Sequence, residues 1–448
     1  MAHALILGAS GISGWSLLNQ ARTYPTPTTF ARITGTTNRA LTLEEARLPA
    51  DDPRLAIVSG IDFTRGVDDV AAAMREKIPD VETVSHVFYT AYTSANGPAD
   101  QAAATANTEF LSVAIQAIEK VSPRLAFVVL QTGGRGYGLM CPDTVRVLRT
   151  PLREDAPRIP RPWADEVFYY AQHDLLQELS RGKGWTFSEI RPDGIVGFAP
   201  TANAMNMARG VGIYLSVWRY VFGTGAGGGV GVGVGVGVGG GDRDGDGVKA
   251  GGVGRRVEVP FPGSLRGYRA THTDTFQDVL SKMEIFAAVV NPEECGGGKA
   301  FNVADGEAVS SWSGVWPRLC AHFGLVGVAP SSPPPPPSGA DTNNETDADA
   351  DTGTGTASGS TNPPSMKAFI AKHDDAWVAL AREHELDEGA AREYNWDFLH
   401  LMLVQCDFDR EYDLTRAREV GFEEEIDTVE GYFTAWERMR DAKQLPSF

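Results

Sequence analysis

Two patterns of hydrophobic residues alternate along the first 200 residues of the chain. Short, mostly apolar runs predict buried strands, and apolar residues repeated every three or four positions predict helices. The expected strands cover residues 4–7, 32–35, 54–58, 83–89, 125–130 and 186–190. The expected helices cover residues 15–21, 67–77, 107–120 and 163–181. This alternation predicts an α/β fold in which a parallel sheet lies between two layers of helices.

The pattern changes at about residue 201, after which helices such as 366–384 and 430–443 dominate. We therefore expect a sheet-bearing core in residues 1–200 and a mostly helical C-terminal lobe in residues 201–448. Ligands of open parallel sheets bind at the carboxyl ends of the strands, so a lobe that caps this edge is expected to bind the substrate.

Two stretches have a composition that does not suit a packed core. Residues 223–254 are mostly Gly and Val, followed by Gly, Asp and Arg, which combines little side chain with high backbone entropy. Residues 331–365 begin with a proline run and continue with Asp, Thr, Gly, Ser and Asn. Low hydrophobicity predicts disorder, so we interpret both as disordered insertions in surface loops. A proline-recognition ligand at residues 333–337 is the alternative for the second stretch.

Composition narrows the class of partner. The chain has 448 residues and a formal net charge of −18, whereas nucleic-acid grooves and anionic membrane surfaces require an excess of Lys and Arg. The four cysteines form no Cys-x-x-Cys pair, and no His/Cys/Asp cluster has metal-site spacing. No signal peptide is evident, and no apolar run reaches the roughly eighteen residues of a membrane span. We therefore expect a cytoplasmic protein that binds a small molecule and no metal; a homodimer is one assembly compatible with the sequence.

A glycine-rich turn between the first strand and the first helix is the strongest chemical signal. The segment from residue 8 to residue 14, GASGISG, places three glycines where the backbone can turn tightly, approach a pyrophosphate and pack against the helix. Free N–H groups and the positive end of that helix favour phosphate. The turn predicts a Rossmann core over residues 1–200 that binds a dinucleotide. The expected binding residues of the turn are Gly8, Ser10, Gly11, Ile12 and Gly14.

The residues after the second strand indicate which dinucleotide is bound. An NAD-preferring site places Asp or Glu at the end of this strand, whereas the segment 36–39, TTNR, contains no acid. Arg39 can pair with a 2′-phosphate and Asn38 can hydrogen-bond to it, so the sequence favours NADP(H). A solvated loop cation is the alternative for Arg39.

Further candidate residues follow the next strands and therefore open on the same crevice. Asp62 follows the third strand, where its carboxylate could accept a hydrogen bond from the adenine amino group; capping the next helix is the alternative. Thr90 and Ala91 follow the fourth strand, and Thr132 follows the fifth. We expect these residues to contact the dinucleotide.

Five segments occur in an order that is specific to one family. They are ALILGASGISG at 4–14, HVFY at 86–89, LQTGGRGY at 130–137, FYYAQHD at 168–174 and SEIRPDGIVGFAP at 188–200. They resemble the progesterone 5β-reductase/iridoid synthase-like (PRISE) family of atypical extended short-chain dehydrogenases/reductases, and AFNVADG at 300–306 is similar as well. The resemblance implies an extended Rossmann fold, NADPH as cofactor, and reduction of the carbon–carbon double bond of activated enones.

The resemblance also assigns residues. It implies that Tyr169 is the catalytic tyrosine, that Ile195 contacts the cofactor, and that Arg135 stands where the family has a lysine. Arg135 keeps the positive charge but is a wider, planar group that does not give up its proton. Four residues after Tyr169 the family has an acid and this chain has His173. When protonated, His173 could act as the lysine of ordinary short-chain dehydrogenases does, but we favour a plain surface histidine.

Together these signals predict an NADPH-dependent reductase of an enone, or of another carbonyl compound, with a small and largely apolar substrate. Hydride reaches the β-carbon while Tyr169 hydrogen-bonds to the carbonyl oxygen, aided by the charge of Arg135. An epimerase or dehydratase on the same fold is a second reading, although such enzymes normally keep Tyr-x-x-x-Lys. A non-catalytic NADP-binding sensor or scaffold is a third, because residues 135 and 173 depart from the family pattern.

Overall fold

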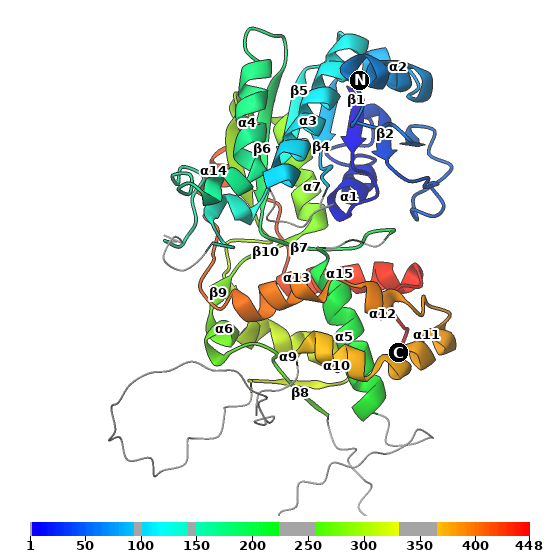
Figure 1. Ribbon diagram of the computed structural model, residues 1–448, viewed down its shortest axis with the longest axis vertical. Coiled ribbons are helices and arrows are strands. Elements are labelled where there is room, and N and C mark those ends of the chain that lie inside the picture. Colours follow the sequence, from blue (N-terminus) through cyan, green and yellow to red (C-terminus); the bar gives the residue numbers. More distant parts are fainter. Residues whose placement is uncertain are drawn as a thin grey trace, which may run out of the picture.

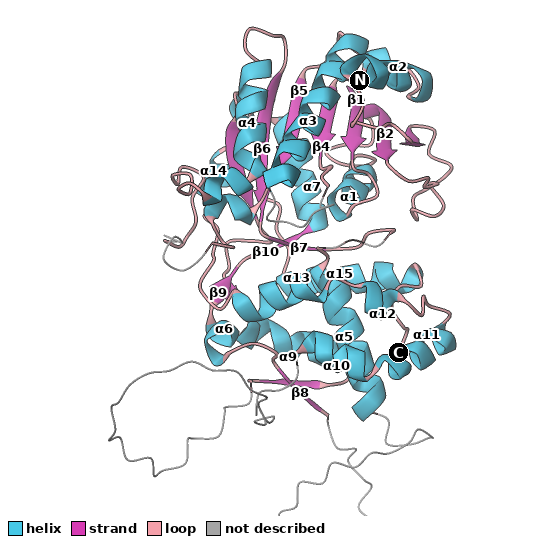
Figure 2. Ribbon diagram, viewed as in Figure 1, coloured by secondary structure: helices cyan, strands magenta, loops and turns pink. Residues whose placement is uncertain are grey.

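Seven strands of the computed structural model form one parallel sheet, in the order β11-β6-β5-β4-β1-β2-β3 (Figures 1 and 2). The structure describes residues 2–93, 101–141, 149–201, 203, 205–223, 257–330 and 365–448. The strands are β1 (Ala2–Leu7), β2 (Phe30–Thr37), β3 (Leu55–Ser59), β4 (His86–Tyr89), β5 (Phe127–Gln131), β6 (Thr186–Pro192) and β11 (Lys299–Val303). The predicted α/β Rossmann fold is confirmed. The predicted insertions 223–254 and 331–365 lie outside the described residues, except at their outermost positions.

Helices cover both faces of the sheet, because successive side chains of a strand point to opposite sides. Ala4 and Ile6 of β1 belong to the core on one face, and Leu5 and Leu7 belong to the core on the other. The helices of the first face are α1 (Ile12–Gln20) and α7 (Gln277–Ile285). Those of the second face are α2 (Val67–Lys77), α3 (Gln101–Val121) and α4 (Phe168–Leu179).

A helical lobe lies below the carboxyl ends of the strands (Figure 1). Its longest helix, α5 (Met207–Phe222), is mostly buried, and the apolar core of the lobe is continuous with the core on the α1–α7 face of the sheet. The other lobe helices are α6 (Leu265–Arg269), α9 (Trp312–His322), α10 (Met366–Lys372), α11 (Asp374–His384), α12 (Ala390–Glu393), α13 (Trp396–His400) and α15 (Thr428–Asp441). Within the described ranges, no helix is both long enough and apolar enough to cross a membrane.

Short strand pairs and two small helices complete the fold. The pairs are β7 (Gly194–Val196) with β10 (Asp274–Phe276), β8 (Glu258–Pro260) with β13 (Val326–Val328), and β9 (Thr271–His272) with β12 (Ser310–Ser311). The small helices are α8 (Pro292–Cys295) and α14 (Thr415–Glu419). The β7–β10 pair lies between the sheet and the lobe, as Figure 1 shows. The pair therefore links the segment just after β6 to the segment just before α7.

The structure departs from the sequence prediction at three places. The predicted helix 163–181 is interrupted at Val167, whose extended backbone buries its side chain, so that α4 begins at Phe168. The predicted helix 366–384 is interrupted at His373, and α11 then begins with Asp374 and Asp375, acids that favour a helix N-terminus. Beyond residue 200 the chain returns to the sheet, because β11 pairs with β6.

Candidate active site

The glycine turn is shaped by the absence of side chains. Gly8 has a φ of 100°, and a Cβ there would lie 2.9 Å from Thr90 Oγ1 and 3.0 Å from the Ala91 nitrogen. A Cβ on Gly14 would lie 2.2 Å from the Gly8 carbonyl oxygen. Gly11 is the N-cap of α1, and no side chain caps the first N–H groups of that helix. The turn therefore brings bare backbone to the end of β1 and leaves helix N–H groups for a phosphate, which fits a dinucleotide.

The ends of β2 and β3 present exposed polar residues beside this turn. Asn38 and Arg39 are exposed, and the Thr37 hydroxyl donates to the Arg39 carbonyl oxygen at 2.6 Å. Among the described residues, the Arg39 guanidinium has no hydrogen-bond or ion-pair partner. Asp62 accepts hydrogen bonds from the Thr64 hydroxyl at 2.7 Å and the Thr64 nitrogen at 3.0 Å, which lower its pKa. Since α2 is capped by Gly66, Asp62 does not cap that helix.

Two further predicted cofactor residues directly follow strands of the sheet, and a third lies within β7. The Thr90 hydroxyl donates to the Leu7 carbonyl oxygen at 2.9 Å and so ties β4 to β1. The Thr132 hydroxyl is buried and donates to Glu189 Oε1 at 2.7 Å, so it points into the protein. Ile195 is half-buried in β7. These positions adjoin the carboxyl edge, as expected, but the hydroxyls of Thr90 and Thr132 already have protein partners.

Tyr169 and Arg135 are brought together at the end of β5. Tyr169 lies in the first turn of α4, and its hydroxyl is 3.8 Å from the position that a Cβ on Gly133 would take. Arg135 lies in the short helix Gly134–Tyr137 and donates through Nη2 to the Glu166 carbonyl oxygen at 3.5 Å. Burial raises the pKa of Tyr169, the charge of Arg135 lowers it, and that of Glu189 raises it. Within the described residues, the Tyr169 hydroxyl has no hydrogen-bond partner, so it is free for a ligand.

The interpretation of His173 as a plain surface histidine is wrong. Its Nδ1 lies 3.1 Å from Glu189 Oε2, and Glu189 is almost fully buried in β6. The ring is therefore tied to a carboxylate. The sequence analysis missed Glu189, although an acid inside an otherwise apolar strand was a visible signal.

Tyr92 ends the same segment as Thr90 and Ala91, and the sequence assigned it no role of its own. It comes directly after Ala91, and its side chain is 43% exposed. Partial enclosure, followed by the proximity of Tyr169, raises the pKa of Tyr92 to about 12. Two tyrosines therefore lie near each other at this end of the crevice.

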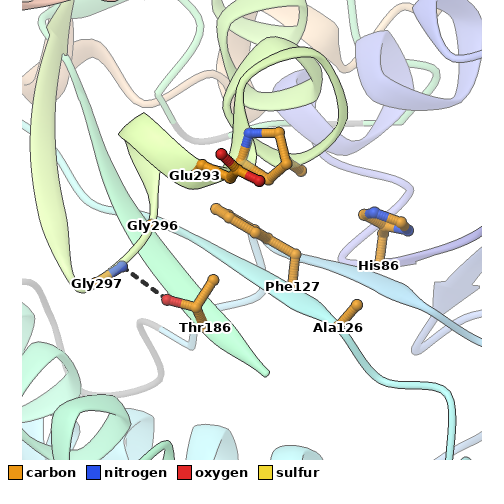
Figure 3. A pocket seen from close by; sticks show the side chains of 9 residues that line it. His86, Ala126, Phe127, Thr186, Glu293, Gly296 and Gly297 are labelled. Carbon is orange, nitrogen blue, oxygen red and sulfur yellow. Dashed lines mark hydrogen bonds between the residues drawn. The ribbon is translucent and has the colours of Figure 1, made fainter. Parts of the chain in front are cut away.

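Two cavities differ in their relation to this edge. One of about 340 Å³ is lined by His86, Phe127 and Thr186 among others, at the amino ends of β4, β5 and β6 (Figure 3). Burial lowers the pKa of His86 to about 4, so its ring is neutral at physiological pH. A second cavity of about 440 Å³ is lined by Thr201, whose hydroxyl donates to the Ser10 carbonyl oxygen at 3.4 Å. Only the second cavity adjoins the glycine turn, so the first is not part of the candidate site.

No metal site accompanies these residues in the part of the chain that the structure describes. No group of three or more His, Cys, Asp or Glu side chains there could hold an ion.

Known proteins are similar to this chain in sequence and in fold. A family described as "PRISE-like Rossmann-fold domain" matches residues 4–232 and 250–446. The short chain dehydrogenase sirQ of Leptosphaeria maculans is 33% identical, with 100% of this chain and 98% of that protein aligned. A 3-oxo-Delta(4,5)-steroid 5-beta-reductase of Arabidopsis thaliana is 26% identical over 72% of this chain and 69% of its own length. Among solved structures, the Bordetella bronchiseptica enzyme WbmG in complex with NAD has a TM-score of 0.53 at 12% identity, covering 100% of this chain and 96% of that one.

Proposed function

Because the chain belongs to the PRISE-like Rossmann-fold family and is an oxidoreductase of the short-chain dehydrogenase/reductase superfamily, we propose that it uses NADPH to reduce the double bond of an activated enone. The proposed substrate is a small, largely apolar molecule. One observation carries the proposal: the Tyr169 hydroxyl, which has no hydrogen-bond partner among the described residues, lies near the Arg135 charge at the end of β5. In the sheet, only β4 lies between β5 and β1, the strand that leads into the glycine turn.

The relatives support the class of reaction. One of them is named as a steroid 5-beta-reductase, and another, from Nepeta racemosa, as an (S)-8-oxocitronellyl enol synthase. The first name describes reduction next to a 3-oxo group, and the second describes formation of an enol. Both fit a site that stabilises negative charge on an oxygen, which is what a neutral tyrosine and an arginine can do.

The choice of NADPH over NADH rests on the end of β2. A 2′-phosphate carries negative charge, and Arg39 offers a guanidinium with no partner among the described residues. Asn38 is exposed beside it, and no acid lies in the segment 36–39 to hold a ribose 2′-hydroxyl. A matched pair of titrations with NADPH and NADH tests this choice directly.

Each residue of the site has a distinct part in the proposed reaction. The glycine turn would hold the dinucleotide, which when bound would supply a hydride for the β-carbon of the enone. The Tyr169 hydroxyl donates a hydrogen bond to the carbonyl oxygen as negative charge develops there, and the charge of Arg135 stabilises the same oxygen. Because Arg135 does not release its proton, it acts by charge alone. The α-carbon takes its proton from solvent or from a side chain.

The test is the oxidation of NADPH by a panel of small enones, followed by absorbance. Tyr169→Phe is expected to lower kcat by about 100-fold or more, roughly 3 kcal/mol, because it removes the hydrogen-bond donor. Tyr24→Phe is the control. Tyr24 packs against the core on the α1–α7 face, opposite α4, and the centre of its ring lies 5.6 Å from Lys282 Nζ, so loss of its hydroxyl should leave enone reduction in place. Unchanged turnover in Tyr169→Phe would show that the assignment is wrong.

The alternative functions give different outcomes in the same assay. Tight NADPH binding without oxidation by any enone supports a non-catalytic sensor or scaffold, which the arginine at 135 and the histidine at 173 favour. Interconversion of a sugar or alcohol without net consumption of cofactor supports an epimerase or dehydratase. We propose the cytoplasm as the compartment and a small molecule, rather than a nucleic acid or a membrane, as the partner. Sedimentation would distinguish a homodimer from a monomer.

A further inference from the structure

Glu189 is a carboxylate buried inside the sheet next to the proposed reaction site. It lies in β6 and is only 4% exposed. It precedes Ile190, which belongs to the core on the α1–α7 face, so its own side chain points to the face that α4 covers. Burying a charged group costs free energy unless hydrogen bonds compensate for the lost hydration.

Three side chains supply those hydrogen bonds. Arg191 binds both oxygens, through Nε to Oε1 at 2.9 Å and through Nη2 to Oε2 at 3.0 Å. The Thr132 hydroxyl donates to Oε1 at 2.7 Å, and His173 Nδ1 lies 3.1 Å from Oε2. Burial alone would raise the pKa of Glu189, but His173 and Arg191 bring it down to about 2. The carboxylate is therefore ionised at neutral pH.

An ionised carboxylate can only accept hydrogen bonds, and this settles how His173 is held. The hydrogen of the contact must sit on His173 Nδ1. Glu189 thereby fixes the orientation of the imidazole ring, as carboxylates do for histidines in other sites. His173 lies one helical turn after Tyr169 on α4, so the same contact holds the part of α4 that carries the tyrosine.

The first turn of α4 is attached on one side through Tyr170, whose hydroxyl donates to the Gly136 carbonyl oxygen at 2.6 Å. No side chain caps its N-terminus, and the Tyr169 hydroxyl has no partner among the described residues. The Tyr169 ring packs edge-on against its neighbour Phe168 at 4.8 Å, which moves with the helix. Glu189, by contrast, connects α4 through His173 to the end of β5 through Thr132. The end of β5 leads directly to Gly133 and Arg135, next to which the tyrosine hydroxyl lies.

We infer that Glu189 is a positioning residue that holds the Tyr169-bearing turn of α4 in register with the Arg135-bearing end of β5. It acts through His173 and Thr132 and does not touch the substrate. This inference rests on the proposed function for its kinetic consequence, but not for its structural one.

The structural consequence is tested by a measurement that needs no enzymatic reaction. Tyrosines are replaced by 3-fluorotyrosine, and the ¹⁹F resonance of Tyr169 is assigned by its loss in Tyr169→Phe. The charged or titratable groups that face Tyr169 are Arg135, Glu189 and Tyr92. Glu189→Gln should lower the titration midpoint of Tyr169, because a negative charge that opposes ionisation is removed. His173→Gln keeps that charge and breaks the contact with Glu189, so it should shift the Tyr169 resonance through the position of α4 alone. A Tyr169 resonance in His173→Gln that matches the wild type would overturn the inference.

The kinetic consequence is measured with the same variant in the NADPH-dependent reduction of enones. Glu189→Gln should lower kcat by about 10-fold or more through misplacement of the tyrosine, while the Kd for NADPH changes less than about twofold. His173→Gln, a milder change at a half-buried position, should produce the same kind of loss. The double variant should lose little more kcat than either single variant, because both substitutions remove the same contact between Glu189 and His173. Additive losses would contradict the coupling.

Glu154→Gln is the matched control. The Glu154 and Glu189 side chains are both 5% exposed, and Glu154 accepts a hydrogen bond from the Asn302 nitrogen at 2.8 Å, away from α4. It should lower stability without moving the Tyr169 resonance or kcat. If His173→Gln moves the resonance in a protein that reduces no enone, the positioning role stands and the proposed function fails. If the wild type reduces enones but Glu189→Gln does so equally well, the positioning role fails and the proposed function stands.

Discussion

At β1 the carboxyl edge of the sheet is shaped by side chains that are missing, whereas at β5 and β6 it is shaped by side chains that carry charge. Gly8 and Gly14 let backbone approach backbone closely. Glu189, Arg191 and His173 fill the other end with a hydrogen-bonded ion network. The first end is suited to binding a ligand whose shape is constant, and the second to holding reacting groups in place.

The two ends also differ in how they respond to solution conditions. A cradle made of backbone has nothing to titrate, so its shape does not depend on pH. An ion network changes when any member gains or loses a proton. The comparison therefore predicts that binding of the dinucleotide and positioning of the tyrosine can be disturbed separately, and three experiments test this.

The largest effect is expected from acid acting on Glu189. Its pKa is depressed from 4.5 to about 2 in the folded protein, so the unfolded chain binds the proton first. The stability that this carboxylate provides is present above about pH 4.5 and is lost as pH falls toward 2, at most roughly 3 kcal/mol. The free energy of unfolding by urea, measured between pH 7 and pH 3, should fall more in the wild type than in Glu189→Gln.

Asp274 serves as the control with the opposite sign. Burial raises its pKa from 3.8 to about 7, despite the nearby Arg410. Its contribution to stability therefore decreases as pH rises from about 4 to 7, and Asp274→Asn should gain stability relative to the wild type over that range. For Glu189, the assignment of the network would be contradicted if the free energy of unfolding fell equally steeply with falling pH in the wild type and in Glu189→Gln.

The next effect is expected from filling the backbone cradle with Gly14→Ala. The new Cβ would lie 2.2 Å from the Gly8 carbonyl oxygen and 2.7 Å from its carbon, and neither backbone atom can move cheaply. We expect a loss of about 1–3 kcal/mol in stability and a matching loss of dinucleotide affinity, seen by thermal unfolding and by nucleotide fluorescence. Gly66→Ala, where nothing lies within 4 Å of a new Cβ, should bind the dinucleotide normally. Normal binding by Gly14→Ala would show that the turn is not the cradle.

The smallest effect is expected at the end of β2. Arg39→Gln should weaken NADPH binding by about 10-fold, or roughly 1.4 kcal/mol, and leave NADH binding unchanged, because only NADPH carries the 2′-phosphate. Arg47→Gln removes the same charge from another exposed position and should alter neither affinity. An equal loss for both nucleotides in Arg39→Gln would mean that the arginine contributes a general field instead of a specific contact.

The same contrast explains what could be predicted from the sequence. The glycine turn is local, and the helix predicted at 67–77 has the observed ends of α2. The charged network depends on residues far apart in the chain, such as Thr132 and Glu189, and no periodicity joins them. Tyr169 and Arg135 were found through the family resemblance, and the structure adds that they are adjacent. The pattern did not show β11, because a short edge strand is recognisable only beside its partner β6.

The return of the chain to the sheet at α7 and β11 sets an order of events during folding. The Ser16 hydroxyl on α1 donates to the Gln277 carbonyl oxygen at 3.0 Å, so the helix that opens the cofactor cradle is completed by a segment made long afterwards. Contacts of such high sequence separation slow folding, because the intervening chain must be ordered first. A nascent chain that has emerged only as far as β6 therefore exposes one apolar face of its sheet. We therefore expect α1, the helix that opens the cradle, to stay partly exposed until α7 has been made.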